Sequence, residues 1–304
     1  MSADPSPTSR ASSQRKAREL VANVATELRL PPDIVALRRI LDDANATPEQ
    51  LIETLGRLPA LTGRLLELIE LPLHRQESDA WTLPRMVHQL GAQRILDLAL
   101  VVMVSDGLAR IELATERCGF WPLAVRTALV SRGIARQCGR PESDRSMVAG
   151  LLMPTGLALL WHADPAGMQR ANQILEQEGT AARAAQRAAT GTDCVAVTTA
   201  LARQWQLPTP IQRALACCDE PARAVPHHFE AAVLRLAQSA CDFPGAGEPP
   251  DPLALSLLNL TPACVHTVAA NTELYYQAYL DFMARRTYPP STASDPDPVM
   301  PAAP

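Results

Sequence analysis

The sequence feature that most constrains the fold is the uncharged run from Gly150 to Trp161, near the middle of the chain. A segment without charges has to be buried, so the rest of the chain must supply a core around it. Pro154 lies inside the run, and proline cannot donate a backbone hydrogen bond to the carbonyl of Gly150. The run must therefore kink at Pro154 or divide into two helices there.

The composition favours helices. The chain has 304 residues, of which 47% are hydrophobic and 20% are charged, as is typical of a soluble globular protein with a sizeable core. Aromatic residues make up only 4%, and alternating β-branched segments are scarce. We therefore expect an all-α protein built from many helices.

Charge and targeting features limit the partners and the location. The net charge of −4 gives no broad positive surface, which argues against nucleic acid as a partner. Lys16 is the only lysine, and its place near the N-terminus excludes mechanisms that need a lysine in the core. The sequence has no secretory signal and no run of roughly 18 apolar residues, so we expect a cytoplasmic protein without a membrane span.

The cysteines do not form a recognisable metal or disulfide pattern. They are odd in number and include no Cys-x-x-Cys pair, which argues against a disulfide framework and a zinc knuckle. We expect them to be buried as small hydrophobic residues. They are Cys118, Cys138, Cys194, Cys217, Cys218, Cys241 and Cys264.

Polar and proline-rich ends flank a helical centre. Residues 1–12 are predicted to form a disordered leader, and residues 288–304 a disordered, proline-rich tail. Between them we expect one main helical domain over residues 13–226 and a C-terminal helical extension over residues 227–287.

Three segments carry clear helix signals. Residues 47–50 read Thr-Pro-Glu-Gln, which predicts a capping box with Thr47 as the N-cap residue. The stretch from Gln93 to Ser105 is almost wholly apolar in its second half, so its helix should lie at the centre of the bundle. Asp144 is predicted to cap the helix that leads into the uncharged run.

Several separated landmarks, in this order, resemble the HD-related output domain (HDOD), a bacterial signalling module related to metal-dependent phosphohydrolases of the HD superfamily. The resemblance covers about residues 25–221 and implies an HD-like helical domain. The landmarks are Leu58-Pro59-Ala60-Leu61, Gln89-Leu90-Gly91 with Arg94, Phe120-Trp121, Gly150-Leu151-Leu152, and Trp205-Gln206-Leu207-Pro208 with Ile211.

The sequence departs from the family pattern wherever a metal ligand would be expected. The adjacent His-Asp pair of the HD superfamily corresponds to Met153-Pro154, and the other expected histidines are also missing. The resemblance thus places a degenerate metal site at Leu123, Met153, Pro154, Cys194, Cys217 and Cys218.

These replacements favour a regulatory module over an enzyme. Divalent ions in such sites need imidazole and carboxylate ligands, whereas methionine offers a soft thioether and proline no side-chain ligand. We therefore expect no catalytic residues, no bound metal and no cofactor. The resemblance implies a bacterial signal-transduction module that acts through protein contacts or a small bound ligand. Its partners would be other signalling proteins or further copies of the same chain.

Two alternatives remain open at this point. A divergent metal-dependent phosphohydrolase would have to recruit ligands from elsewhere, such as His162, Asp164 or Asp193. A thiol-based metal or redox sensor could use Cys194 together with the pair Cys217-Cys218. The interpretation that these cysteines simply fill a former pocket is favoured, because free cysteine is among the most buried residue types.

One further set of residues is a candidate contact surface. Arg126, Arg132 and Arg136 recur on one predicted helix, where they could form a basic face for an acidic partner or a nucleotide phosphate. A solvated face without a partner is the favoured interpretation.

Overall fold

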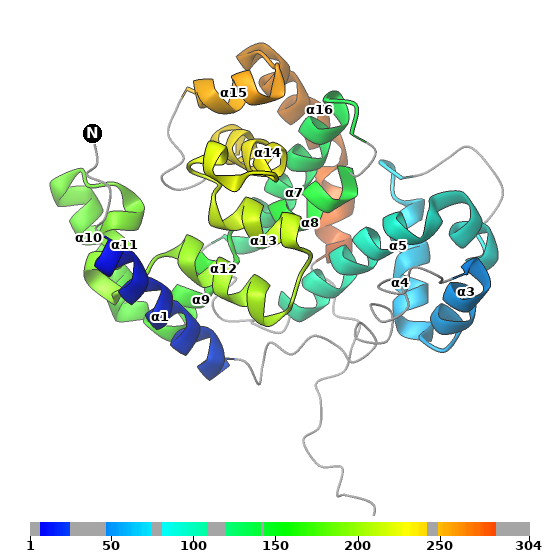
Figure 1. The fold of residues 1–304 in the computed structure, drawn as a ribbon, viewed down its shortest axis with the longest axis horizontal. Helices are drawn as coiled ribbons and strands as arrows, with labels where there is room; N and C mark the ends of the chain where they lie inside the picture. Colours follow the sequence, from blue (N-terminus) through cyan, green and yellow to red (C-terminus); the bar gives the residue numbers. More distant parts are fainter. Residues whose placement is uncertain are drawn as a thin grey trace, which may run out of the picture.

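The computed structural model describes residues 7–24, 47–74, 81–108, 119–140, 143–241 and 249–283. Within these ranges the chain forms helices joined by turns and contains no strand, so the all-α prediction is confirmed (Figure 1). The residues expected to form the disordered tail, 288–304, lie outside the described ranges.

The helices differ widely in length and follow one another closely along the chain. Their bounds are α1 (Pro7–Val24), α3 (Pro48–Gly56), α4 (Pro59–Glu70), α5 (Leu83–Leu108), α7 (Phe120–Gln137), α8 (Ser143–Leu152), α9 (Thr155–Ala163), α10 (Pro165–Glu178), α11 (Ala182–Thr190), α12 (Cys194–Gln204), α13 (Thr209–Ala216), the 3-10 helix η1 (Pro221–Ala224), α14 (His228–Ala240), α15 (Pro252–Leu258) and α16 (Pro262–Met283).

Two of the local predictions are borne out in atomic detail. The hydroxyl of Thr47 accepts a hydrogen bond from the Gln50 amide at 3.3 Å, and the Thr47 amide donates to the Gln50 side chain at 2.9 Å. At Pro154 the uncharged run divides, because α8 ends at Leu152 and α9 begins at Thr155. The helix is therefore interrupted at Pro154, and the residues on both sides of the interruption stay buried in the core.

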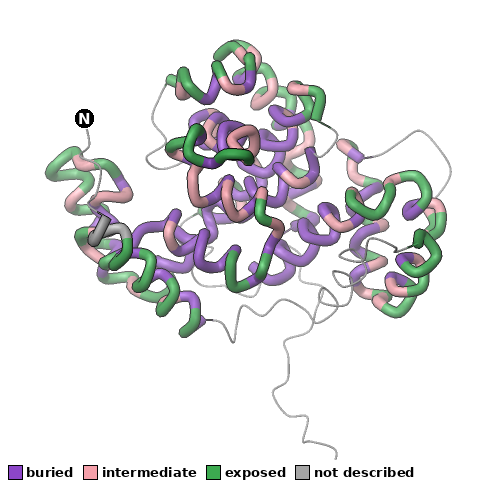
Figure 2. The backbone as a smooth tube through the Cα atoms, viewed as in Figure 1, coloured by how far each residue is buried: buried purple, intermediate pink, exposed green. Residues whose placement is uncertain are grey.

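The first of the two helices around this division, α8, packs tightly on α7, whereas α9 packs on α12. A side chain added at Gly150 would meet the carbonyl oxygen of Thr127 at 2.5 Å, so only glycine permits this approach of α8 to α7. The buried residues form a continuous band through the middle of the molecule (Figure 2). The core predicted around the uncharged run is thus present, with α5, α7, α8 and α12 supplying much of it.

Two of the C-terminal helices, α14 and α16, contribute to the main core. Leu234 of α14 and Tyr279, Phe282 and Met283 of α16 are buried in one cluster with residues of α5, α7 and α8. The Arg64 side chain of α4 donates to the Phe282 carbonyl at 2.9 Å and stacks on the Phe282 ring. A second, smaller cluster joins α14, α15 and the start of α16 to the last turns of α7. The main core thus crosses the expected boundary at residue 226, while the C-terminal helices also have a cluster of their own.

The N-terminal helix also begins earlier than expected. α1 starts at Pro7, inside the segment that was expected to be a disordered leader. It packs along α12, and the Ser13 hydroxyl donates to the Thr192 hydroxyl at 3.2 Å (Figure 1). This contact, with the burial of Ala17 and Val21, explains why the polar N-terminal sequence is helical.

The sequence predicts no membrane span, but some helices are long and apolar enough to form one. By length and composition alone, α5 and the pair α8–α9 could each cross a membrane, and α15 with α16 could form a broken span. The bundle buries 56% of the most apolar part of α5 and 83% of that of α8–α9. α5 is also broken at Gly91, whose φ of 75° is not helical. Their apolar surface is therefore used largely for the core.

Glycine at position 156 is predicted to be essential for the packing of α9 on α12. In Gly156→Ala the new Cβ would lie 1.9 Å from the Cys194 carbonyl oxygen, so we expect the free energy of unfolding to fall by roughly 3 kcal/mol. In the control Gly63→Ala, on an open surface of α4, stability should rise by about 0.5 to 1 kcal/mol because alanine favours helix. Urea denaturation measures both, and equal effects would contradict the packing argument.

Candidate functional site

Three of the residues that the family resemblance assigned to a degenerate metal site lie at the contact between α9 and α12. Met153, Pro154 and Cys194 are all buried there. The Gly156 amide donates to the Thr198 hydroxyl at 2.9 Å, and that hydroxyl lies 3.4 Å from the Met153 carbonyl oxygen. The polar groups at this contact therefore have hydrogen-bond partners within the protein, and the Met153 and Pro154 side chains are buried beside them.

Leu123 lies at the same end of the α7–α8 pair. The two helices are antiparallel, because Arg132 meets Asp144 while Thr127 lies against Gly150. Leu123, one turn before Thr127, is therefore level with the end of α8. It packs half-buried against the main core.

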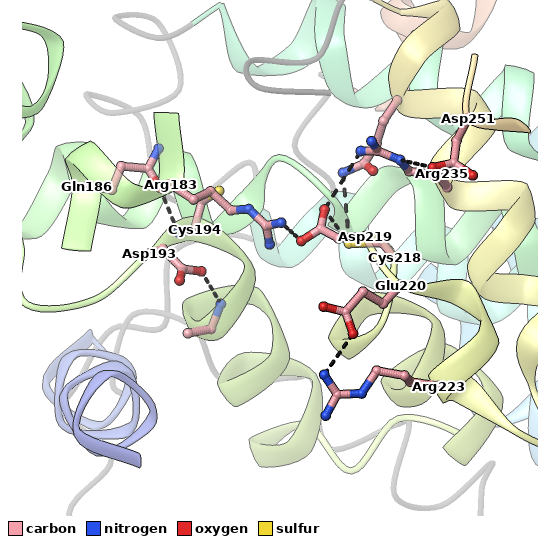
Figure 3. A network of polar contacts seen from close by, with 12 residues as sticks. Arg183, Gln186, Asp193, Cys194, Cys218, Asp219, Glu220, Arg223, Arg235 and Asp251 are labelled. Carbon is pink, nitrogen blue, oxygen red and sulfur yellow. Dashed lines mark hydrogen bonds and ion pairs between the residues drawn. The ribbon is translucent and has the colours of Figure 1, made fainter. Parts of the chain in front are cut away.

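The second group of cysteines lies at the end of α13, with Cys218 buried and Cys217 half-buried. The guanidinium of Arg183, from α11, lies between this turn and Cys194, and its charge acts on both Cys194 and Cys218 (Figure 3). It forms an ion pair with Asp219, the residue that follows Cys218. An arginine is thus placed between Cys194 and the Cys217-Cys218 turn, two places that the family resemblance assigned to the degenerate site.

The Arg183–Asp219 pair is part of a longer ionic chain (Figure 3). Arg235 of α14 lies 3.8 Å from Asp219 and 3.7 Å from Asp251, the N-cap residue of α15. Gln238 of α14 also donates to the Cys218 sulfur at 3.9 Å. Two arginines alternate here with two carboxylates, so the charges around the cysteines compensate each other.

The buried thiols are held in their protonated form. Burial raises the pKa of Cys194 to about 12, and the neighbouring Asp193 raises it further. Burial also raises the pKa of Cys218, against the opposing effect of Arg183 and Arg235. Metal binding and redox chemistry both require a thiolate. Among the described residues, no group of three or more histidine, cysteine or acidic side chains is placed to hold a metal ion.

The alternative ligands for a divergent phosphohydrolase have other roles. Asp164 caps α10 by accepting from the Gly167 amide at 2.7 Å. Asp193 caps α12 and forms an ion pair with Arg187 at 2.7 Å. His162 is exposed at the end of α9. The structure therefore does not bring these three side chains together as a ligand set.

The proposed basic face of α7 is not continuous. Arg132 is only 2% exposed, which corrects the expectation of a solvated face at that position. Arg126 pairs with Glu273 of α16 at 2.9 Å and stacks on the Tyr276 ring at 4.3 Å. Of the three arginines, only Arg136 is exposed. α7 uses its arginines mainly to hold other helices.

Arg132 belongs to a buried charge cluster around Asp144 that the sequence reasoning missed. The Asp144 carboxylate accepts from Arg132 Nε at 2.6 Å and from Arg94 Nε at 2.8 Å, and His74 Nδ1 lies 3.8 Å away. Asp144 was predicted to be a helix cap, which is wrong, because α8 begins at Ser143 and Asp144 points inward at 1% exposure.

The missed signal was the helical spacing of Asp144. Met147, Val148 and Leu151 follow it at intervals of three, four and seven residues, so all four side chains share one face of α8. A carboxylate on an apolar helix face must be buried with a partner. The spacing could have placed Asp144 in the core, although it could not have named Arg132.

The local charges decide how this cluster ionises. Burial opposes ionisation of Asp144, but the positive charges of His74 when protonated, Arg132 and Arg94 outweigh burial and lower its pKa to about 2. Burial lowers the pKa of His74 to about 3; Asp144 opposes this, and nearby arginines assist it. At neutral pH Asp144 is therefore charged and His74 neutral.

A second buried carboxylate behaves in the opposite way. Burial raises the pKa of Asp97 on α5 to about 7, and the Asp144 charge raises it further, whereas Arg145 opposes the rise. Arg145 lies 3.5 Å from the Asp97 carboxylate, and Gln93 donates to it at 3.3 Å. Asp97 is thus poised to change its charge near neutral pH.

We predict that Asp97→Asn gains stability relative to the wild type as pH rises from about 4 to about 7. In this range the folded wild type keeps a proton on Asp97 that the unfolded chain releases, so wild-type stability decreases by up to about 1.4 kcal/mol per pH unit. His74 has the opposite slope, but it is present in both proteins and cancels in the difference. Denaturation at several pH values measures this difference.

Asp144→Asn provides the contrast. Its lost charge should cost about 3 to 5 kcal/mol, because Arg132 is left buried without its partner. Above about pH 5 the titration of Asp144 itself should add no pH dependence to this loss, because Asp144 is ionised in both the folded and the unfolded wild type; only its effect on the pKa of Asp97 remains. A flat difference for Asp97→Asn would contradict the assignment.

We predict that Cys194 and Cys218 of the native protein react with iodoacetamide at least about tenfold more slowly than Cys264. The first two are buried with raised pKa values, whereas Cys264 is half-buried and Thr261 lowers its pKa. Mass spectrometry of the labelled peptides gives each rate, and labelling in urea serves as the control. Zinc-dependent protection of Cys194 and Cys218 would instead support the thiol sensor.

Comparison with known proteins gives a family match and several similar folds. A sequence model of the HDOD domain matches residues 28–221, whereas a search of the curated proteins gives no match. A candidate signal transduction protein from Marinobacter aquaeolei VT8 has a TM-score of 0.66 and 17% identity, covering 90% of this chain and 67% of that one.

Two further structures show the same architecture. A candidate phosphohydrolase from Shewanella amazonensis SB2B has a TM-score of 0.60 and 20% identity, over 87% of this chain and 96% of that one. An HDOD domain protein of unknown function from Geobacter sulfurreducens has a TM-score of 0.59 and 20% identity, over 90% and 97% of the two chains. At these identities the likeness concerns the fold.

Proposed function

Because this chain belongs to the HDOD family, we propose that it is a non-catalytic regulatory module of bacterial signal transduction. It would act in the cytoplasm through contacts with other signalling proteins or through a small bound ligand. The name of the Marinobacter protein, which refers to signal transduction, is consistent with this role.

The observation that carries the proposal is the state of the former metal site. Met153 and Pro154 fill one side of it, and Cys194 and Cys218 are buried thiols with raised pKa values. A phosphohydrolase of this type needs a metal ion to polarise the phosphate and to activate water. Groups that remain neutral at neutral pH, next to an arginine, do not attract a divalent cation.

The ionic chain gives a physical reason why the fold persists without a metal. A bound metal ion links ligands from several helices and so contributes to folding. Here Arg183 of α11 and Arg235 of α14 both pair with Asp219, and Arg235 also faces Asp251. These pairs connect α11, the end of α13, α14 and α15. We infer that they have taken over this connecting role.

A loss of catalysis need not entail a loss of signalling. A scaffold that no longer hydrolyses its ligand can still report binding, provided that the ligand or partner binds two conformations differently. The Shewanella protein, whose name refers to a phosphohydrolase, has a similar fold, so the enzymatic alternative is compatible with this architecture. Direct measurement on the purified protein separates the two.

The purified protein is predicted to contain no stoichiometric metal and to hydrolyse neither nucleotides nor cyclic dinucleotides. Elemental analysis and chromatography of reactions with added Mg²⁺, Mn²⁺ or Ni²⁺ test this. The reason is the absence of ionised ligands at positions 153, 154, 194 and 218. Metal-stimulated turnover that disappears in His162→Ala would establish the phosphohydrolase alternative.

Affinity capture of binding partners from the native cell tests the regulatory role. A partner should be captured by the wild-type protein and by Cys264→Ser, a change distant in sequence from the former site. The double replacement of Cys217 and Cys218 by serine, which alters the contact with Gln238 and the turn at Asp219, should capture less of that partner. Equal capture by all three proteins would argue against the former site as the recognition surface.

A further inference from the structure

A polar pocket of about 430 Å³ lies away from the former metal site. It is enclosed by the part of α5 that follows the break at Gly91, by the first turn of α8, and by the turn between α12 and α13. Its described lining consists of Gln93, Leu96, Arg145, Arg203, Gln206, Leu207, Pro208, Thr209, Pro210 and Gln212.

The pocket and the former site are at opposite ends of α8. Arg145 is near the beginning of this helix, and Met153 follows its last residue. Eight residues of helix separate two side chains by about 12 Å. The pocket is therefore a different place from the degenerate metal site.

The charge of the pocket is positive. Arg145 and Arg203 both line it, and none of its described lining residues is acidic. Arg145 is partly neutralised by Asp97, which is buried behind it at 3.5 Å. Arg203 is exposed in the last turn of α12, and no ion pair links it to another described residue. Two guanidinium groups around one cavity favour an anion, and phosphate matches their geometry.

The other lining groups suit an organic molecule more than a bare ion. Gln93, Gln206 and Gln212 bring three carboxamides, which can donate to and accept from the edge of a base. Leu96, Pro208 and Pro210 provide apolar surface. A volume of about 430 Å³ is within the range of small-molecule sites and exceeds what a phosphate ion needs.

The backbone at Gln206 is an independent sign of a functional constraint. Its φ of 50° is left-handed, a conformation that favours glycine and that glycine commonly adopts just after a helix. The turn closes with the Leu207 amide donating to the Ala202 carbonyl at 3.0 Å. A glutamine at this position costs backbone strain, and it brings a carboxamide to the pocket wall.

We propose that this pocket binds a small organic phosphate of mononucleotide size, with Arg203 and Arg145 holding the phosphate and the glutamines contacting the organic part. This deepens the proposed function, on which it rests, by naming the class of ligand that the module would sense. The ligand would connect α5, α8 and the α12–α13 turn, three parts of the chain that are distant in sequence.

Isothermal titration calorimetry with AMP as the probe, and with inorganic phosphate as the minimal probe, tests the proposal. Wild-type protein should bind AMP more tightly than inorganic phosphate. Arg203→Gln should weaken AMP binding by at least about tenfold, because a charge-assisted hydrogen bond is lost. Arg136→Gln is the matched control, since it removes the same charge from an exposed site on α7 and should leave binding unchanged.

Gln206→Gly separates binding from folding. Glycine relieves the left-handed strain, so the melting temperature should rise while AMP binding weakens. A variant that is more stable and yet binds less cannot be explained by misfolding. A melting temperature and an affinity that both stay unchanged would contradict the role given to Gln206.

The remaining outcomes are also decisive. Absence of AMP binding, equal weakening by Arg203→Gln and Arg136→Gln, or equal affinity for AMP and inorganic phosphate would overturn the proposal. Chromatography of the same samples shows whether AMP is hydrolysed. Binding with hydrolysis would refute the non-catalytic function and leave the pocket standing, whereas no binding and no hydrolysis would refute the pocket alone.

Discussion

The buried carboxylate of Asp144 is the interaction on which the arrangement of the helices depends. It joins α8 to Arg132 of α7 and Arg94 of α5, and it approaches His74 after α4. Hydrogen bonds to a charged group are directional, so these contacts fix the position of each helix along its neighbours. Apolar packing alone would restrict these positions less. Burial of these charges has a high desolvation cost, so each group depends on the others remaining in place.

The ion pairs around Asp219 also join opposite charges from separate helices, next to the cysteines of the proposed former metal site. The two places differ in their access to water. Around Asp144 the charges are enclosed in the core, whereas Asp219 is about a third exposed beside Arg183 and Arg235. A metal centre concentrates positive charge at one point and keeps its ligands deprotonated. Arginines spread that charge over planar groups, and neighbouring thiols can stay neutral.

The sequence was sufficient for those features that depend on neighbouring residues. The capping box at Thr47 and the division of the run at Pro154 follow from local hydrogen bonding, and the apolar centre of α5 follows from composition. Other features depend on tertiary contacts. They are the pairing of Asp144 with Arg132, the burial of Arg132 and the contribution of α16 to the core. Such contacts join residues that sequence spacing does not relate. The landmarks of the family predicted a degenerate site at Cys194 and Cys218, but they could not predict that Arg183 lies between these two residues.

The position of α16 has a consequence for how the protein is made. Tyr279, Phe282 and Met283 complete a core whose other walls come from α5, α7 and α8, and Arg64 of α4 is held by the Phe282 carbonyl. During synthesis α5, α7 and α8 leave the ribosome before residue 283, so their apolar surface stays exposed until α16 can cover it. The contact between Ser13 and Thr192 also spans 179 residues. The core can therefore close only when residues up to 283 are available, and until then the apolar surface of the earlier helices is exposed to aggregation.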